Sequence, residues 1–170
     1  SKGFFGLHLK TLLALQYAYS EGGLLSMSAV TGYRAHTFTM SPEVTFSPSF
    51  GTFYYAGQFT VNGMNTDETA QNMLFCWRQN LSYTQTIGNV DITLSAVHYR
   101  NELQSAQTVN TLLADAGVVW RLKKVRLQAE LRNIFNRRNY AVTYYGSASS
   151  STTYYNLRPR EIILSAQISL

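Results

Sequence analysis

Strict alternation of apolar and polar residues near the C-terminus constrains this chain more than any other feature. Between residues 125 and 132 the apolar residues are Val125, Leu127, Ala129 and Leu131, and those between them are Arg126, Gln128, Glu130 and Arg132. Side chains of a β-strand point alternately to its two faces, so this stretch predicts a strand with one apolar and one charged face. Residues 160–170 alternate in the same way, with Ile163 as the one exception.

The same period of two recurs along the whole chain and predicts an all-β fold. About eight antiparallel strands are expected, in simple up-and-down order. They cover residues 5–19, 37–46, 52–61, 73–87, 90–101, 112–122, 125–131 with a continuation at 139–145, and a closing strand at 153–170 that runs to the last residue. Gly22 and Gly23 are expected to end the first strand, and Pro42 to cause a bulge or local break in the second.

The connections between these strands alternate in length. Turns near Pro48, Gly88 and Lys123 are expected to be short, whereas residues 21–34, 62–71, 102–110 and 146–152 are expected to be long loops. Short turns on one rim and long loops on the other are typical of outer-membrane β-barrels.

The charges on the predicted polar faces also favour a barrel with a wet or polar interior. These residues are Arg78, Asp91, Asp115, Arg121, Arg126, Glu130 and Arg132. Buried charges are costly unless they are paired or hydrated, so a dry soluble core would not accept them. The chain lacks the run of about 18 apolar residues that a transmembrane helix needs, but a barrel strand needs only about 9–11 residues. The alternative is an ordinary soluble sheet of amphipathic strands.

Other functional classes find little support in the sequence. The net charge is +5, but the basic residues are scattered, so nucleic-acid binding is not predicted. A single cysteine excludes an internal disulfide framework and a cysteine-based metal site. His8, His36 and His98 lie on different predicted strands without a catalytic partner set. We therefore expect no enzymatic activity, no cofactor and no bound metal.

Residues 123–170 resemble the C-terminal end of TonB-dependent outer-membrane receptors of the Bacteroidetes type. The resemblance rests on Asn133-Ile134-Phe135-Asn136, on the aromatic Tyr140 that follows, and on an arginine-containing final strand after residues 157–161. Residues 17–47 and 115–122 look like barrel strands of the same family. Members of that family usually end in Phe or another aromatic residue, which the assembly machinery recognises, whereas this chain ends in Leu170.

The resemblance implies that residues 1–170 are one segment, the last third or so, of a barrel of about 22 strands. The plug domain, the TonB box and the earlier strands would lie outside this chain. Such a receptor is a multi-pass outer-membrane protein that takes up a glycan, peptide or chelate. Its partners would be outer-membrane lipids, the rest of the same receptor, TonB and a surface lipoprotein. A complete eight-stranded outer-membrane barrel with a structural or adhesion role is the alternative.

Several residues are candidates for a role in binding or assembly. Arg126, Glu130 and Arg132 are expected to face the lumen, where they would contact the plug or each other. Tyr144, Tyr145, Tyr154 and Tyr155 flank the last predicted loop and are candidates for ligand contact, with packing at the membrane interface as the alternative. The resemblance implies an assembly signal at Ile162, Leu164, Ile168 and Leu170. Phe53, Tyr55, Trp77, Tyr83 and Trp120 are expected to face lipid.

Overall fold

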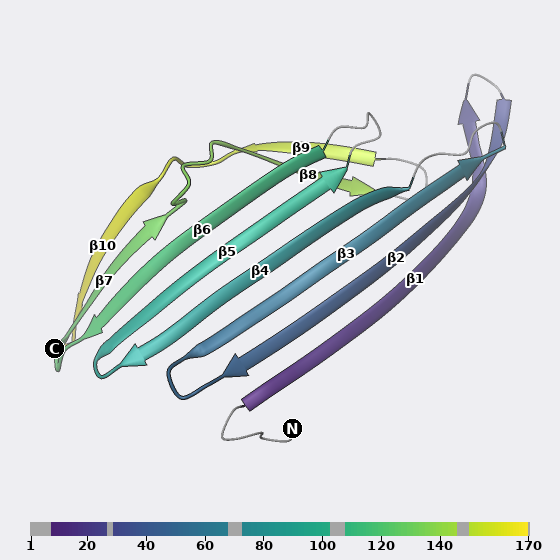
Figure 1. Ribbon diagram of the computed structural model, residues 1–170. Helices are drawn as coiled ribbons and strands as arrows, with labels where there is room; N and C mark the ends of the chain where they lie inside the picture. Colours follow the sequence, from purple (N-terminus) through teal and green to yellow (C-terminus); the bar gives the residue numbers. More distant parts are fainter. Residues whose placement is uncertain (1–7, 27–28, 68–72, 103–107, 146–149, 170) are drawn as a thin grey trace.

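The computed structural model describes residues 8–26, 29–67, 73–102, 108–145 and 150–169 (Figure 1). Within these ranges the chain forms ten β-strands and no helix. The strands are β1 (His8–Ser26), β2 (Ala29–Ser47), β3 (Thr52–Thr66), β4 (Leu74–Ile87), β5 (Val90–Glu102), β6 (Thr108–Arg121), β7 (Val125–Arg132), β8 (Asn139–Tyr145), β9 (Ser150–Asn156) and β10 (Glu161–Ile168). The prediction of an all-β fold is confirmed.

Eight of these strands form one antiparallel sheet in the order β1-β2-β3-β4-β5-β6-β7-β10. The remaining two, β8 and β9, pair with each other as a separate hairpin beside the start of β6. β1 and β10 are the edges of the sheet and lie on opposite sides of it in Figure 1. The sheet is therefore open within the described residues.

The prediction of about eight antiparallel strands as successive neighbours is confirmed for the main sheet, but the C-terminal segment differs in detail. Residues 139–145, predicted to continue the seventh strand, form β8 outside this sheet. The predicted closing strand at residues 153–170 is divided into β9 and β10, of which only β10 pairs with β7. Pro159 lies in the interruption, where it has no N–H to donate to a ladder. β10 ends at Ile168, although the N–H of Ser169 still donates to the carbonyl of Lys124 at 2.9 Å.

The prediction that two glycines end the first strand is also wrong. β1 continues through Gly22 and Gly23 to Ser26, opposite Tyr33, Gly32 and Ala29 on β2. The ring of Tyr33 lies 3.0 Å from where a side chain on Gly22 would begin, so the neighbouring strand covers this position. Strands also replace parts of three other predicted loops, because β3 continues to Thr66, β6 begins at Thr108 and β9 begins at Ser150.

Pro42 interrupts one ladder without breaking its strand. On one side it pairs with Leu13 of β1. On the other side the ladder with β3 stops at Met40↔Phe59 and resumes at Glu43↔Ala56. The register is the same on both sides of the gap, so no residue is inserted and there is no bulge. The predicted local break is confirmed in the β2–β3 ladder alone.

The three predicted short turns are confirmed and lie at one rim of the sheet. Gly51 donates its N–H to the carbonyl of Pro48 at 3.2 Å, and Leu122 donates to Val125 at 2.7 Å. Gly88 has a φ of 57°, a conformation that glycine adopts without steric cost. At the opposite rim, parts of the connections lie outside the described residues.

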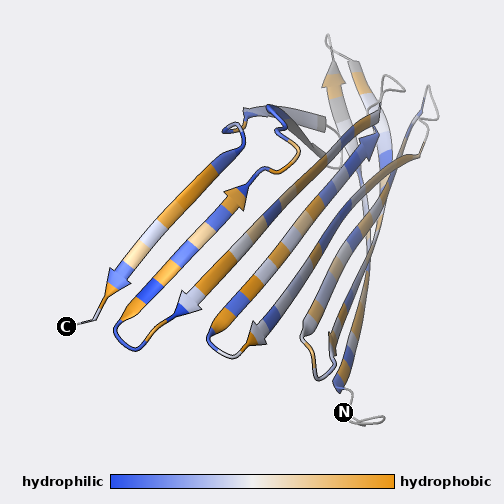
Figure 2. Ribbon diagram, turned by 60° about the vertical axis from the view of Figure 1, so that its left-hand side comes forward, coloured by the Kyte–Doolittle hydropathy of each residue, from blue (hydrophilic) through white to orange (hydrophobic). Residues whose placement is uncertain are grey.

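The register gives the sheet one apolar and one polar face. One row of paired residues crosses all eight strands and is apolar throughout: Leu9, Phe46, Phe53, Tyr83, Leu94, Ala116, Leu131 and Ile162. A row on the other face contains Lys10, Thr45, Tyr54, Ser82, Ser95 and Asp115. The alternation along each strand is visible in Figure 2. We call these the outer and the inner face.

The outer face is exposed. Leu164 is 76% exposed, Leu15 62% and Trp120 48%. Among the buried residues on strands, Ala35, Asn101 and Thr111 lie on the inner face and Gly57 on the outer face. No large side chain is fully buried among the described residues. The sheet therefore has no dry core, and its largest apolar surface has no cover.

Candidate functional site

The inner face collects the charges of the central part of the sheet. The register places ten of them there: Lys10, Glu43, Arg78, Asp91, Asp115, Arg121, Arg126, Glu130, Arg132 and Glu161. The alternation predicted that these residues share the polar face, and the register of the sheet places them on that face. On the outer face, the charged residues of β1, β2 and β5 lie close to the rim opposite the short turns; they are Glu21, Arg34, Arg100 and Glu102.

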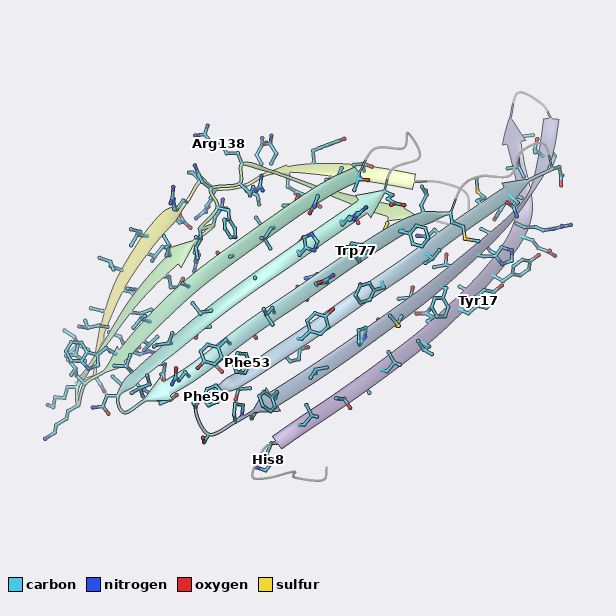
Figure 3. All side chains as sticks on the ribbon, viewed as in Figure 1. His8, Tyr17, Phe50, Phe53, Trp77 and Arg138 are labelled. Carbon is cyan, nitrogen blue, oxygen red and sulfur yellow. The ribbon has the colours of Figure 1, made fainter. Side chains whose placement is uncertain are left out.

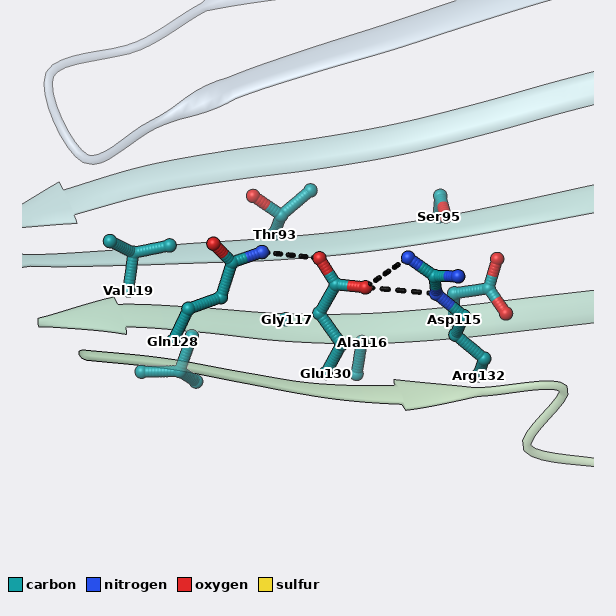
Figure 4. A pocket seen from close by; sticks show the side chains of 10 residues that line it. Thr93, Ser95, Asp115, Ala116, Gly117, Val119, Gln128, Glu130 and Arg132 are labelled. Carbon is teal, nitrogen blue, oxygen red and sulfur yellow. Dashed lines mark hydrogen bonds and ion pairs between the residues drawn. The ribbon is translucent and has the colours of Figure 1, made fainter. Parts of the chain in front are cut away.

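Glu130 of β7 is the centre of a hydrogen-bonded group on this face. Arg132 donates to Oε2 of Glu130 through Nε at 2.8 Å and through Nη2 at 2.6 Å. Gln128 donates its amide to the other carboxylate oxygen of Glu130. Arg132 also lies 3.9 Å from the carboxylate of Glu161 on β10. Figure 4 shows Gln128, Glu130 and Arg132 aligned along one side of the strand.

These side chains line an open hollow of about 540 Å³ over β5, β6 and β7. Its polar lining includes Thr93, Ser95, Asp115, Gln128, Glu130 and Arg132. Arg132 keeps 50% of its side chain exposed and Glu130 keeps 25%. Hydroxyl, amide, carboxylate and guanidinium groups thus face the hollow together, an arrangement suited to hydrogen bonding with a polar solute or protein surface.

A second ion pair lies nearer the short turns. Arg121 of β6 contacts Asp91 of β5 at 2.5 Å, and the hydroxyl of Thr86 donates to the same carboxylate at 2.8 Å. Arg126 pairs across the ladder with Arg121 and is not part of the hollow around Glu130. The structure therefore joins Glu130 and Arg132, and places Arg126 on the same face but nearer the rim with the short turns.

The candidate tyrosines belong to the β8–β9 hairpin. Tyr154 is 73% exposed and Tyr155 46%. Both line a hollow of about 440 Å³ between the hairpin and the start of β6, together with Val109 and Thr111. Tyr144 and Tyr145 lie on β8, but their side chains are outside the described residues. The tyrosine hollow and the Glu130 hollow share no lining residue.

The Asn133–Asn136 turn has a structural role that the alternation did not reveal. Both asparagines have positive φ, 50° and 52°, a conformation that asparagine tolerates better than most residues. Asn133 donates its side-chain amide to the carbonyls of Arg137 at 2.7 Å and Arg158 at 2.8 Å. Its side-chain oxygen accepts the N–H of Arg137 at 2.9 Å.

Further bonds connect the same turn to the main sheet and to β10. The N–H of Asn133 donates to the carboxylate of Asp115 at 2.8 Å. Arg160 donates its N–H to the side-chain oxygen of Asn136 at 3.0 Å, and Leu157 donates to the carbonyl of Arg138 at 2.8 Å. We call this set of bonds the asparagine clamp. The clamp fixes the base of the β8–β9 hairpin and positions the chain at the start of β10.

Aromatic residues predicted to face lipid lie on the outer face. Phe53 and Tyr83 pack with ring centroids 4.5 Å apart near the short turns. Toward the opposite rim, the guanidinium of Arg100 lies 4.8 Å from the ring centre of Trp77. The labelled rings of Figure 3 are distributed along the strands from Phe50 to Trp77. The register also places Tyr55 and Trp120 on the outer face.

The residues of the expected assembly signal lie on the edge strand. Ile162, Leu164 and Ile168 are 73%, 76% and 68% exposed on the outer face of β10. Leu170 is outside the described residues. The role of this set in assembly stays a prediction.

The histidines are far apart in the register and lie on several strands. His36 contacts the hydroxyl of Tyr17 at 2.8 Å, and His98 contacts the side-chain oxygen of Asn110 at 2.7 Å. In the part of the chain that the structure describes, no group of three His, Cys, Asp or Glu residues could hold a metal ion. The same part contains no helix long and apolar enough to cross a membrane.

No protein-family model matches this chain, and no significant match was found among curated proteins or solved structures.

Proposed function

We propose that this chain is the C-terminal barrel segment of a TonB-dependent outer-membrane transporter of the Bacteroidetes type. One observation carries the proposal: an exposed apolar face continues across all eight strands, while the charges of the central sheet lie on the opposite face. A continuous apolar surface of this extent is not stable against water and needs a hydrocarbon or protein cover. Lipid outside and a polar lumen inside meet both requirements.

The length of the uncharged region along the strands supports a lipid bilayer as the cover of the outer face. On β5 the outer face carries no charge from Val90 to His98, and Arg100 and Glu102 follow. On β1 the uncharged stretch ends at Glu21. These lengths are those of strands that cross the hydrocarbon layer, about 9–11 residues. Trp77 beside Arg100 then lies at the level where aromatic and basic side chains meet lipid headgroups.

The two open edges support a larger barrel. β1 is 19 residues long and β10 has 8, and among the described residues each has a neighbouring strand on one side only. Backbone N–H and C=O groups that lack partners in a bilayer cost several kcal/mol each, by general estimate. We therefore infer that earlier strands of the same receptor pair with these edges and complete a barrel of about 22 strands.

The inner face then forms part of the transport path. In this reading the Glu130 hollow contacts the plug domain or the passing solute, and the tyrosines of the β8–β9 hairpin contact the ligand near the rim. The cargo is a glycan, peptide or chelate, energy comes through TonB, and a surface lipoprotein is a further partner. These parts of the proposal rest on the resemblance of residues 123–170 to the receptor family.

Thiol labelling in isolated outer membranes tests the location. In a Cys76→Ala background, Leu164→Cys places a thiol on the outer face and Ser165→Cys places one on the inner face of the same strand. A membrane-impermeant thiol reagent should label the inner position and leave the outer one unlabelled. Equal labelling of both would contradict the membrane assignment.

Uptake tests the transport function separately. Cells that carry the full receptor should accumulate its ligand, and a proton uncoupler should stop this accumulation. Ligands are screened from glycans, peptides and chelates, with cells that lack the protein as the control. Uptake that persists in the presence of the uncoupler would exclude an energised transporter.

The alternative of a complete eight-stranded barrel makes a different prediction. Such a barrel would require β1 and β10 to pair, and the described residues of these strands do not. The mass of the native polypeptide decides between them. A protein several times heavier than 19.2 kDa supports the receptor, and one of 19.2 kDa supports the small barrel.

A further inference from the structure

Four arginines gather where β7 ends and β10 begins. Arg137 and Arg138 follow the Asn133–Asn136 turn, and Arg158 and Arg160 precede β10. All four side chains are exposed. Figure 3 places Arg138 at this rim, beyond the end of β7. They are four of the 14 Lys and Arg residues of the sequence. We call them the arginine patch.

The asparagine clamp holds the patch together through its backbone. The carbonyls of Arg137 and Arg158 accept from the same side-chain nitrogen of Asn133, at 2.7 and 2.8 Å. Two acceptors of one nitrogen lie at most roughly 5–6 Å apart. The N–H of Arg160 is bonded to Asn136, and the carbonyl of Arg138 is bonded to Leu157. None of these bonds uses a guanidinium group.

No ion pair joins these four guanidinium groups to an acid among the described residues. Two acids of this region have other partners, because Asp115 accepts the N–H of Asn133 and Glu161 lies 3.9 Å from Arg132. Like charges that the backbone holds close together repel one another. A bound anion would remove that cost.

We propose that the arginine patch binds the phosphate groups of membrane lipids. The inference rests on the proposed membrane location. Guanidinium groups bind phosphate oxygens bidentately, and several together suit a phosphate better than a single carboxylate. The position of the arginine patch in the fold favours membrane lipid as the source of the phosphate groups. Arg160 lies two residues before Ile162, the first apolar outer-face residue of β10. Lipid phosphates lie at that boundary between hydrocarbon and water.

The test uses the full polypeptide in phosphatidylcholine vesicles that contain some phosphatidic acid, whose headgroup is a bare phosphate. Native mass spectrometry of the protein released from these vesicles counts the retained lipids of each kind. The test variant is Arg137→Gln/Arg158→Gln. The matched control is Lys123→Gln/Lys124→Gln, which removes the same charge at the opposite rim. Both pairs are exposed, and the clamp uses only backbone atoms of Arg137 and Arg158.

The wild type and the lysine control should retain phosphatidic acid in preference to phosphatidylcholine. In the arginine variant this preference should fall by roughly thirtyfold, the loss expected for two basic side chains at an anionic surface. Equal retention in all three proteins would overturn the proposal. So would binding of inorganic phosphate to the detergent-solubilised protein with the same affinity, because the site would then serve a soluble anion.

Protection of the strands from protease in the same vesicles separates the two proposals. If the strands are protected but the arginine variant retains lipid as the wild type does, only the lipid-phosphate site is wrong. If the strands of the wild type are digested, the membrane location is wrong and the lipid site falls with it.

Discussion

The side-chain amide of Asn133 donates a hydrogen bond of 2.8 Å to the carbonyl of Arg158, 25 residues later in the chain. The same nitrogen also holds the carbonyl of Arg137, so one side chain joins the strand that enters the β8–β9 hairpin to the segment that leaves it. The short asparagine motif on which the resemblance to a receptor family rests thus positions the chain to rejoin the sheet after the hairpin.

Removing this side chain should loosen the base of the hairpin. Asn133→Ala removes three side-chain hydrogen bonds. It also places alanine at a φ of 50°, where alanine has no side-chain hydrogen bond to offset the steric cost. The expected cost is about 2–4 kcal/mol of local stability. Hydrogen exchange of the Leu157 and Arg160 amides measures it, because both donate within the clamp.

Asn133→Asp is the matched control for the donor. It keeps the side-chain acceptor for Arg137 and tolerates positive φ, but it has no N–H for the two carbonyls. We expect an intermediate increase in exchange. Unchanged exchange in both variants would mean that the hairpin is held by other contacts.

An arginine on the outer face should oppose membrane folding. Leu127→Arg or Leu164→Arg places a charge at mid-height of the outer face, where the expected cost is about 2–4 kcal/mol or a failure to assemble. Gln128→Arg, one residue away on the inner face, should be mild. Denaturant titration of the protein folded into lipid vesicles compares the three. Equal costs would contradict the assignment of the two faces.

The two tryptophans should report contact with lipid. Trp77 and Trp120 are the only tryptophans of the sequence, and both lie on the outer face. Single-tryptophan proteins are made by Trp77→Phe or Trp120→Phe. Brominated lipids should quench the fluorescence of each, and aqueous iodide should quench it weakly.

An inward-facing tryptophan is the control for this experiment. Thr93→Trp, in a protein that lacks both natural tryptophans, places the ring at the Glu130 hollow. It should respond to iodide and not to brominated lipid. A stronger iodide effect at Trp77 and Trp120 would show that the outer face meets water.

The ion pairs of the inner face should contribute little to stability if the lumen is wet. Arg132 and Glu130 are partly exposed, and water weakens the attraction between exposed charges. A double-mutant cycle with Arg132→Met and Glu130→Gln should give a small coupling that falls as salt is raised. A strong coupling that salt does not change would instead indicate a dry interior.

Alternation predicted the strands and their two faces because it reflects a geometric property of every extended chain. Turn-forming residues at Pro48, Gly51 and Gly88 predicted two of the short turns, and the break in alternation at residues 123–124 predicted the third. The alternation placed Glu130 and Arg132 on one face but left open whether they contact the plug or each other, and the structure pairs them along a single strand.

The remaining features depend on partners far away in sequence. Nothing near Gly22 indicates that Tyr33 will cover it and let the strand continue. The division between β9 and β10 falls at Pro159, but Arg158 and Arg160 on either side of it are held by Asn133 and Asn136, more than 20 residues earlier in the chain. The sequence prediction was wrong at these positions because contacts between residues far apart in the sequence determine the structure there.

Because β10 pairs directly with β7, the whole segment between Arg132 and Glu161 is an excursion that leaves the sheet and returns to it. This segment does not set the register of the β7–β10 ladder. Insertions at the distal tip of this excursion should be tolerated, because lengthening a surface loop adds only a small entropic penalty. A tag or epitope placed there would leave the neighbouring strands aligned, provided that the two asparagines at its base are retained.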